Sequence, residues 1–256
     1  MKHFNLRGAW SIYTRELMRA FRTAFQSILA PVLTTSLYFI VFGSAIGGRM
    51  PPILGVEYAQ FIIPGLLMLT LLGETTSNAS FGIYMPRFTG TIYELLSAPV
   101  GVAETLIGFV GAAATKSLIL AAIILGTAHL FVDYTIVHPF LAIGFILLVA
   151  ASFSLFGFIL GVWADSFEKL GIIPMLILMP LTFLGGTFYS IDMLPEPWDK
   201  IALANPIAFL VSGLRWTFYG VSDVPIGISF GLTLVFLCVC IATIAVIFRT
   251  GWRLRE

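Results

Sequence analysis

The chain has 256 residues, of which 59% are hydrophobic and only 11% are charged. Soluble globular proteins carry roughly a quarter charged residues, so this composition excludes a water-soluble globule. The 14 Lys and Arg against 13 Asp and Glu give a net charge of +1, which provides no basic field for holding a nucleic acid by its phosphates. The sequence therefore predicts a membrane protein with no nucleic-acid partner.

Four long stretches contain no Asp, Glu, Lys or Arg, and they measure 26, 31, 22 and 25 residues. They begin after Arg22, Asp133, Lys169 and Asp223. A helix crosses a bilayer with about 20 residues, so each stretch is long enough to span it. Two more spans follow if ionisable residues are allowed inside them, Glu74 in the first and Lys116 in the second. We predict an all-α integral membrane protein with one transmembrane domain over residues 1–256, its six spans at 25–48, 58–82, 102–131, 138–163, 170–188 and 224–248.

Lys and Arg gather on one side of the predicted membrane topology. With both termini cytoplasmic, ten basic residues lie inside: Lys2, Arg7, Arg15, Arg19, Arg22, Arg87, Lys169, Arg249, Arg253 and Arg255. Three lie outside: Arg49, Lys200 and Arg215. This positive-inside bias predicts a plasma-membrane protein with cytoplasmic N- and C-termini, and no cleavable signal is recognisable before the first span.

Residues 1–24 are expected to form an amphipathic helix that lies in the inner headgroup layer. On a helical projection, one side carries Ser11, Arg15, Arg19 and Arg22, and the other carries Trp10, Tyr13, Leu17, Phe21 and Ala24. Such a helix places cations towards phosphate and cytosol and aromatic rings towards lipid. It serves either as a simple topogenic anchor or as a contact for a cytoplasmic partner.

The inner loop at 84–99 is expected to contain a short helix. Pro86 acts as a breaker, Gly90 as a flexible point and Pro99 as a stop, which leaves a helix from Thr91 to Ala98. Ile92, Leu95 and Leu96 form its apolar face, with Glu94 among polar neighbours. This amphipathic helix either docks a soluble protein or packs on its own membrane neighbours.

The segment at 189–220 is expected to form a re-entrant hairpin on the outer side. Gly185 and Gly186 would bend the preceding apolar helix. The uncharged stretch 201–214 measures about 21 Å, which is too short for a hydrocarbon core near 30 Å, and Asn205-Pro206 interrupts it. Arg215 and Trp216 would close the hairpin. Irregular backbone at membrane depth requires cover by protein or a water-filled cavity, so this hairpin is expected to line or cap a passage.

Two ionisable residues, Glu74 and Lys116, lie deep inside predicted spans. Glu74 is expected about 24 Å from the outer surface and Lys116 about 20 Å from the inner one, a difference in depth of about 14 Å that argues against direct pairing. An ionisable residue at depth faces a cavity or the protein interior, because exposure to lipid costs about 2.5 kcal/mol or more. Either a translocation pathway or a structural helix contact fits both residues. An ion-coupled secondary transporter that uses Glu74 and Lys116 is the alternative function.

An enzyme is not predicted. His3, His129 and His138 lie near membrane ends, and no H-E-x-x-H motif or paired carboxylates unite them with Glu74 or Asp133. We interpret the histidines as having no catalytic role and the Ser and Thr hydroxyl groups as helix-packing groups. No catalytic or metal-binding residue is assigned.

Two motifs resemble those of the ABC-2 exporter permease family, the membrane subunits of ATP-binding-cassette exporters. The outer motif comprises Leu181, Leu184-Gly185, Leu194-Pro195, Asn205-Pro206-Ile207 and Arg215. The inner motif comprises Gly90-Thr91, Glu94-Leu95-Leu96 and Ala98-Pro99. The resemblance extends over nearly the whole chain and is strongest to the compact permeases of the family.

The resemblance implies a homodimer of six-span subunits that rests on two copies of a cytoplasmic ABC ATPase. The residues implied in ATPase docking are Arg15, Arg19, Arg22, Thr91, Tyr93, Glu94, Leu95, Leu96, Asp165, Glu168 and Lys169. Those expected along the pathway are Glu74, Lys116, Gly185, Gly186, Asn205, Pro206 and Arg215. The chain has no G-x-x-x-x-G-K-[ST] phosphate loop, so ATP and magnesium are expected on the partner ATPase and no cofactor on this chain. The implied cargo is a hydrophobic, amphipathic, lipid or glycan substrate.

Overall fold

The computed structural model describes residues 4–22 and 24–252, and within these ranges the chain is helical with no β-strand. The short N-terminal helix α1 (Leu6–Arg22) precedes the first span, which comprises α2 (Ala24–Tyr38), η1 (Phe39–Ile46) and η2 (Gly47–Arg49). The middle of the chain forms α3 (Tyr58–Phe88), α4 (Ile92–Ser97), α5 (Val102–His129) and α6 (Pro139–Trp163). The remainder forms α7 (Phe167–Ile173), η3 (Pro174–Leu178), α8 (Met179–Leu184), η4 (Ile191–Met193), α9 (Trp198–Leu203), α10 (Pro206–Tyr219) and α11 (Ile226–Thr250).

Six helical segments in the described part of the chain are long and apolar enough to cross a membrane. They are Ser27–Arg49, Tyr58–Phe88, Val102–His129, Pro139–Trp163, Phe167–Leu184 and Ile226–Thr250. Helices satisfy every backbone N–H and C=O within the segment, which hydrocarbon demands of any single spanning element. The prediction of a six-span, all-α integral membrane protein is confirmed.

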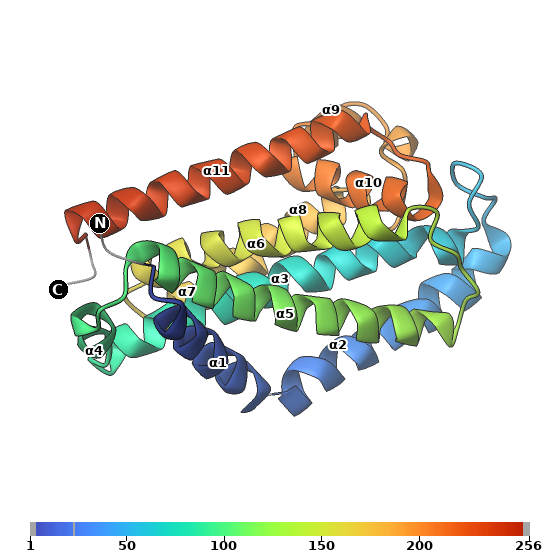
Figure 1. The fold of residues 1–256 in the computed structure, drawn as a ribbon. Helices are drawn as coiled ribbons and strands as arrows, with labels where there is room; N and C mark the ends of the chain where they lie inside the picture. The colour runs from blue at the N-terminus through green and yellow to red at the C-terminus, as the bar shows by residue number, and fades with distance from the viewer. Residues whose placement is uncertain (1–3, 23, 253–256) are drawn as a thin grey trace.

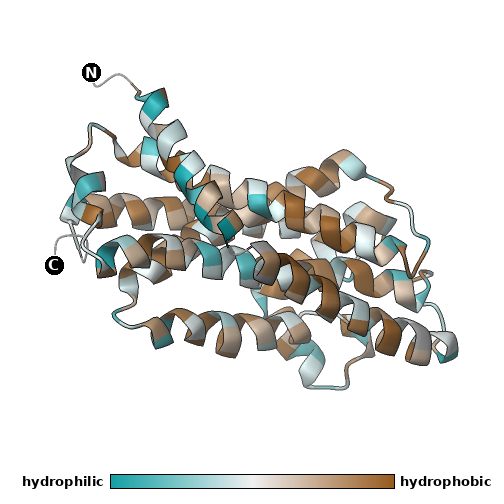
Figure 2. Cartoon of the chain, turned by 90° about the horizontal axis from the view of Figure 1, so that it is seen from below, coloured by the Kyte–Doolittle hydropathy of each residue, from teal (hydrophilic) through white to brown (hydrophobic). Residues whose placement is uncertain are grey.

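The long helices run side by side, and different short helices lie at the two ends of the bundle (Figure 1). The basic end, on the left of Figure 1, carries α4, α7, the C-terminal end of α11 and the start of α1, and its cations include Arg7, Arg87, Lys169 and Arg249. The hairpin end, on the right, carries α9 and α10. Hydrophobic residues cover most of the long helices, whereas hydrophilic ones mark α1 and the turns (Figure 2).

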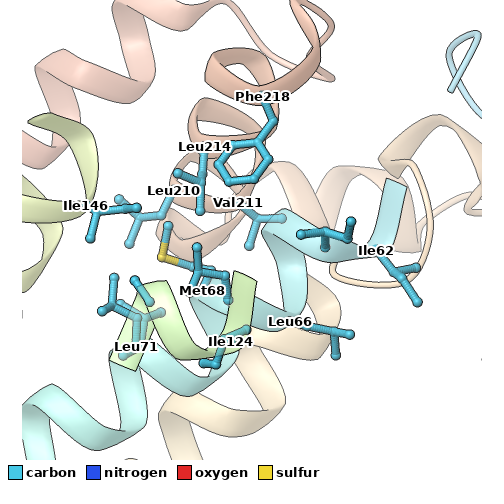
Figure 3. Packing of buried hydrophobic residues seen from close by; sticks show 14 of the residues in the cluster. Ile62, Leu66, Met68, Leu71, Ile124, Ile146, Leu210, Val211, Leu214 and Phe218 are labelled. Atoms are coloured by element: carbon cyan, nitrogen blue, oxygen red, sulfur yellow. The ribbon is translucent and has the colours of Figure 1, made fainter. Parts of the chain in front are cut away.

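The helix α3 forms the centre of the bundle and packs on α5, α6 and α10. Its residues Phe61, Ile62, Ile63, Leu67 and Met68 are completely buried. Figure 3 shows the surrounding cluster, to which α5 contributes Ile124, α6 Ile146, and α10 Leu210, Val211, Leu214 and Phe218. Lipid tails are as apolar as these side chains, so close van der Waals packing rather than removal from water holds such helices together.

The helix α3 is longer than its predicted span, because Pro86 does not break it. The helix continues to Phe88 with Pro64 and Pro86 inside it, and it ends at Thr89, followed by Gly90 at φ +78°. The side chain of Arg87 donates to the carbonyl oxygens of Gly161 and Val162 at 2.8 and 2.7 Å, which ties this last turn to α6. The helix α3 therefore ends just before the left-handed Gly90, and the prediction that Pro86 breaks the helix was wrong.

Candidate transport groove and partner-docking end

A groove of about 480 Å³ lies between the first, second and fifth spans. Its walls come from α2, from α3, and from the segment α7–η3–α8. Among the six spans, the first and the fifth are the least buried. Only 18% and 17% of the residues in their most apolar stretches are buried, against 67% for α3. The groove thus opens on a side of the bundle where no other element of the described chain packs.

Glu74 lines this groove, and Lys116 on α5 pairs with it. The Lys116 Nζ atom lies 3.4 Å from Glu74 Oε2. The expectation that depth separates the two was wrong, because it assumed helices that end at the bilayer surfaces. The helices have 31 and 28 residues, about 46 and 42 Å, and both overshoot a 30 Å hydrocarbon core. Glu74 lies 14 residues from Phe88, the basic-end terminus of α3, and Lys116 lies 14 residues from Val102, the basic-end terminus of α5. The two residues are therefore at a similar depth.

At the hairpin end, the paired glycines end a helix instead of bending one. The helix α8 stops at Leu184, and Gly186 has φ +82°, a left-handed conformation that glycine adopts without steric cost. The chain then runs back against α3, where a Cβ on Gly65 would lie 2.4 Å from the carbonyl oxygen of Thr187. The bend predicted at Gly185 and Gly186 is therefore a helix terminus packed on α3.

Asn205 joins three elements of the hairpin end. Its Oδ1 atom accepts from the backbone N–H of Ile207 at 3.0 Å, which caps α10, and Pro206 occupies the first turn. Its Nδ2 atom donates to the carbonyl oxygen of Leu181 at 2.5 Å, at the end of α8. The break between α9 and α10 lies where the sequence predicts it, and the buried amide side chain fixes α10 to α8.

Arg215 is completely buried in α10, and Asp223 neutralises it. The guanidinium donates through Nη1 to Asp223 Oδ2 at 2.6 Å and through Nη2 to the carbonyl oxygen of Gly186 at 2.5 Å. Its Cζ atom lies 3.7 Å from the centre of the Phe61 ring, within cation–π range. Burial lowers the pKa of Arg215 to about 10, and Asp223 opposes that shift, so the guanidinium stays charged at neutral pH.

The assignment of Arg215 to the outer aqueous surface was therefore wrong. The helix α10 continues past it to Tyr219, and the left-handed Gly220 turns the chain back so that Asp223 meets Arg215. The Asp223 carboxylate also accepts from the Ser190 hydroxyl and from the backbone N–H of Ile191. One ion pair thus holds the segments before α9 and after α10 together.

At the basic end, α1 packs on α5 through a face that the two-sided projection missed. The buried residues of α1 are Ala9, Ile12, Glu16 and Ala20. The two helices approach closely at Gly108, which has no side chain: a Cβ built there would lie 2.7 Å from Ile12 Cγ2. Trp10 and Phe21 remain exposed. A stripe of small and aliphatic residues therefore holds α1 against the bundle.

Glu16 organises the arginines of α1. Its carboxylate lies 2.8 Å from Arg19 Nε and 3.4 Å from Arg15 Nη2. Arg19, expected to face water, instead reaches α3 and donates to the backbone and side-chain oxygens of Asn78 at 3.0 and 3.2 Å. Arg15 and Arg22 stay exposed. Of the three predicted docking cations, Arg15 and Arg22 are at the surface, while Arg19 connects α1 to α3.

The helix α4 begins after Thr91 and presents polar residues outward. Ile92 is buried, whereas Tyr93 and Glu94 are exposed. The backbone of Leu95 and Leu96 belongs to α4, but their side chains lie outside the described part of the chain. Because Arg87 anchors the end of α3 to α6, the turn that carries α4 projects from a fixed base.

The second predicted contact, at the start of α7, lies beside the end of α3. Ser166 caps α7, and Lys169 Nζ lies 2.7 Å from Asp165 Oδ2. The ring of Phe167 packs on Tyr84 and Phe88 at 5.0 and 5.1 Å between centroids, while Glu168 is exposed. Aromatic contacts therefore bring the segments before α4 and at α7 to one surface.

Sequence reasoning missed Asp223, Glu16, Arg87 and Glu104. Asp223 served only as a boundary of the last span, yet it is the counter-ion of Arg215. Glu104, inside the predicted third span, accepts from the backbone N–H of Asn5 at 3.0 Å and fixes the start of α1 to α5. Asp223, Arg87 and Glu104 are ionisable residues near helix ends, and that placement in the sequence was the available signal for them.

Six spans, a mainly apolar groove that contains the carboxylate of Glu74, and a projecting helix at the basic end define a polytopic membrane transport protein. Residues 7–219 match the family model described as ABC-2 type transporter, and the chain belongs to that family. It is 36% identical over 238 residues to the inner membrane transport permease YadH of Escherichia coli (strain K12), which covers 93% of each chain. It is 22% identical to nodulation protein J of Rhizobium leguminosarum bv. viciae, over 90% of this chain and 89% of that one. The resemblance inferred from the two motifs is confirmed.

Proposed function

We propose that this chain is the membrane-spanning subunit of an ATP-driven exporter in a bacterial inner membrane. Two copies would form a homodimer on two copies of a cytoplasmic ABC ATPase, with both termini cytoplasmic. The ATPase would bind ATP and magnesium. The homodimer would move a hydrophobic, amphipathic, lipid or glycan substrate outward through the groove beside α3.

The exposed polar face of α4 is the observation that carries this proposal. Tyr93 and Glu94 point away from the bundle, and the start of α7 lies at the same end. A connecting turn that only reversed the chain would not need such a helix. An ATPase surface that receives α4 would meet Arg15 and Arg22 of α1 beside it.

The length of α3 supports a mechanical link between this end and the hairpin end. One continuous helix runs from Gly65, which lies against the backbone of Thr187, to Phe88, close to α4. Closure of the two ATPase subunits would press on α4 and tilt α3. That tilt would shift the 185–191 segment and alter the wall of the groove.

Replacing Tyr93 and Glu94 by Ala is expected to weaken assembly with the proposed ABC ATPase partner when the two are co-expressed. The measurement is co-purification and substrate-stimulated ATP hydrolysis in nanodiscs, with at least a tenfold loss of coupled activity expected. Glu196→Ala is the matched control, because that exposed carboxylate lies at the hairpin end. Normal assembly and coupling of the α4 variant would contradict the docking assignment. Transport by the isolated permease on an ion gradient alone would establish the ion-coupled alternative.

A further inference from the structure

The groove beside α3 exposes the carboxylate of Glu74, whereas its partner Lys116 is not among the residues that line the groove. Among the described residues that line it, Glu74 is the one Asp, Glu, Lys or Arg. Lys116 approaches from the opposite side, where it lines a small separate cavity with Phe21 and Ile28. A ligand in the groove would therefore meet the carboxylate first and the ammonium group only behind it.

The Glu74–Lys116 pair leaves the carboxylate incompletely satisfied. Its separation of 3.4 Å exceeds the 2.7–2.9 Å of a strong charge-assisted hydrogen bond. Lys116 is the only hydrogen-bond partner of Glu74 within the described residues. The Glu74 side chain is 34% exposed, whereas Lys116 is 13% exposed. The carboxylate thus keeps acceptor capacity that is directed into the groove.

The rest of the wall suits an apolar body around a positive charge. Tyr38, Leu69, Met175 and Met179 supply aromatic, aliphatic and thioether surface. Aromatic faces and thioether sulfurs are polarisable groups that tolerate cations and irregular apolar shapes. The volume of about 480 Å³ lies within the usual range of about 300–1,000 Å³ for small-molecule sites.

We propose that this groove selects organic cations, with Glu74 as their counter-ion. Lys116 orients the carboxylate while the groove is empty, and an entering cation then shares that carboxylate. The inference rests on the proposed function in treating the groove as the substrate path, but it concerns charge selectivity and needs neither ATP nor the ATPase.

Binding of a matched pair of ions to the purified full-length permease tests this selectivity. Tetraphenylphosphonium and tetraphenylborate have nearly the same size and opposite charge, and their binding in nanodiscs is measured by equilibrium dialysis against empty nanodiscs. We expect the cation to bind at least tenfold more tightly than the anion. Glu74→Gln should weaken cation binding about tenfold, whereas Glu74→Asp and the surface control Glu196→Gln should retain it.

A second variant protects the test against misfolding, because Glu74→Gln alone leaves a half-buried Lys116 without its partner. The double variant Glu74→Gln/Lys116→Gln removes both charges and should fold while losing the preference for the cation. Equal cation binding by the wild type and the double variant, or tighter binding of the anion, would overturn the proposal. ATP hydrolysis stimulated by a neutral substrate would still support the exporter function in that case.

Discussion

Asp223→Asn is expected to lower the free energy of unfolding by roughly 3–5 kcal/mol, because it leaves a buried guanidinium without its counter-ion. Arg215 and Asp223 are 0% and 1% exposed, and their atoms lie 2.6 Å apart. An Asn side chain can still accept a hydrogen bond, but with the Gly186 carbonyl oxygen and the face of Phe61 it leaves Arg215 only neutral partners. Equilibrium unfolding in mixed dodecyl maltoside and dodecyl sulfate micelles measures the change.

Arg215→Lys is expected to lose most of the same stability even though it preserves the charge. An ammonium group lacks the planar fork that donates at once to Asp223 and Gly186 while stacking on Phe61. The double variant Arg215→Met/Asp223→Leu should recover part of the loss, because it buries no unpaired charge.

The matched control is the ion pair of Lys200 and Glu196 at the same end of the molecule. These atoms lie 3.0 Å apart, but both side chains are largely exposed. Lys200→Met should change the free energy of unfolding by less than about 1 kcal/mol. Equal effects of the buried and the exposed substitutions would show that Arg215 does not depend on its partner.

The six spans could be predicted because charges punctuate the sequence wherever the chain leaves the apolar phase. The length of α3 could not, because Arg87 lies within its last turn, just as Glu104 lies within the first turn of α5. Both side chains bond to protein, to carbonyl oxygens of α6 and to Asn5 respectively, so a charge there does not end the helix. That overshoot is the source of the error in the depths of Glu74 and Lys116.

The hairpin end shows a different limit of sequence reasoning. Length and Asn205-Pro206 correctly predict a broken segment too short to cross the bilayer. The assumption that a charged residue lies in water failed at Arg215, because the turn after α10 brings the counter-ion Asp223 to it inside the protein. That turn leaves a trace in the sequence, since Gly220 lies between Arg215 and Asp223, but helical periodicity contains no information about it.

The arginines of α1 show that charge alone does not define a surface. Helical projection separates cations from aromatic residues, yet the face that packs on α5 contains Ala9, Ile12 and Ala20 with Glu16 among them. Glu16 then draws Arg19 inward. A carboxylate three residues before an arginine was a visible signal that this cation has an internal partner.

Gly161→Ala is expected to destabilise the contact between α6 and α3 by roughly 1–3 kcal/mol, measured by the same micelle unfolding assay. Gly157 and Gly161 form a G-x-x-x-G pair on α6, a spacing that lets membrane helices approach closely. A Cβ at Gly161 would lie 2.2 Å from the Ser80 carbonyl oxygen, and one at Gly157 would lie 2.4 Å from that of Thr76. Both obstacles are backbone atoms, so the helices would have to separate.

Gly144→Ala on the same helix is the matched control, because no atom lies within 4 Å of a Cβ built there. It should be neutral or stabilise by up to about 1 kcal/mol through helix propensity. Separation at Gly161 would also lengthen the bonds from Arg87 to the Gly161 and Val162 carbonyl oxygens, which fix the turn that carries α4. Gly161→Ala should therefore weaken ATPase assembly as well as stability, whereas a loss of stability with unchanged assembly would show that α4 is positioned independently of α6.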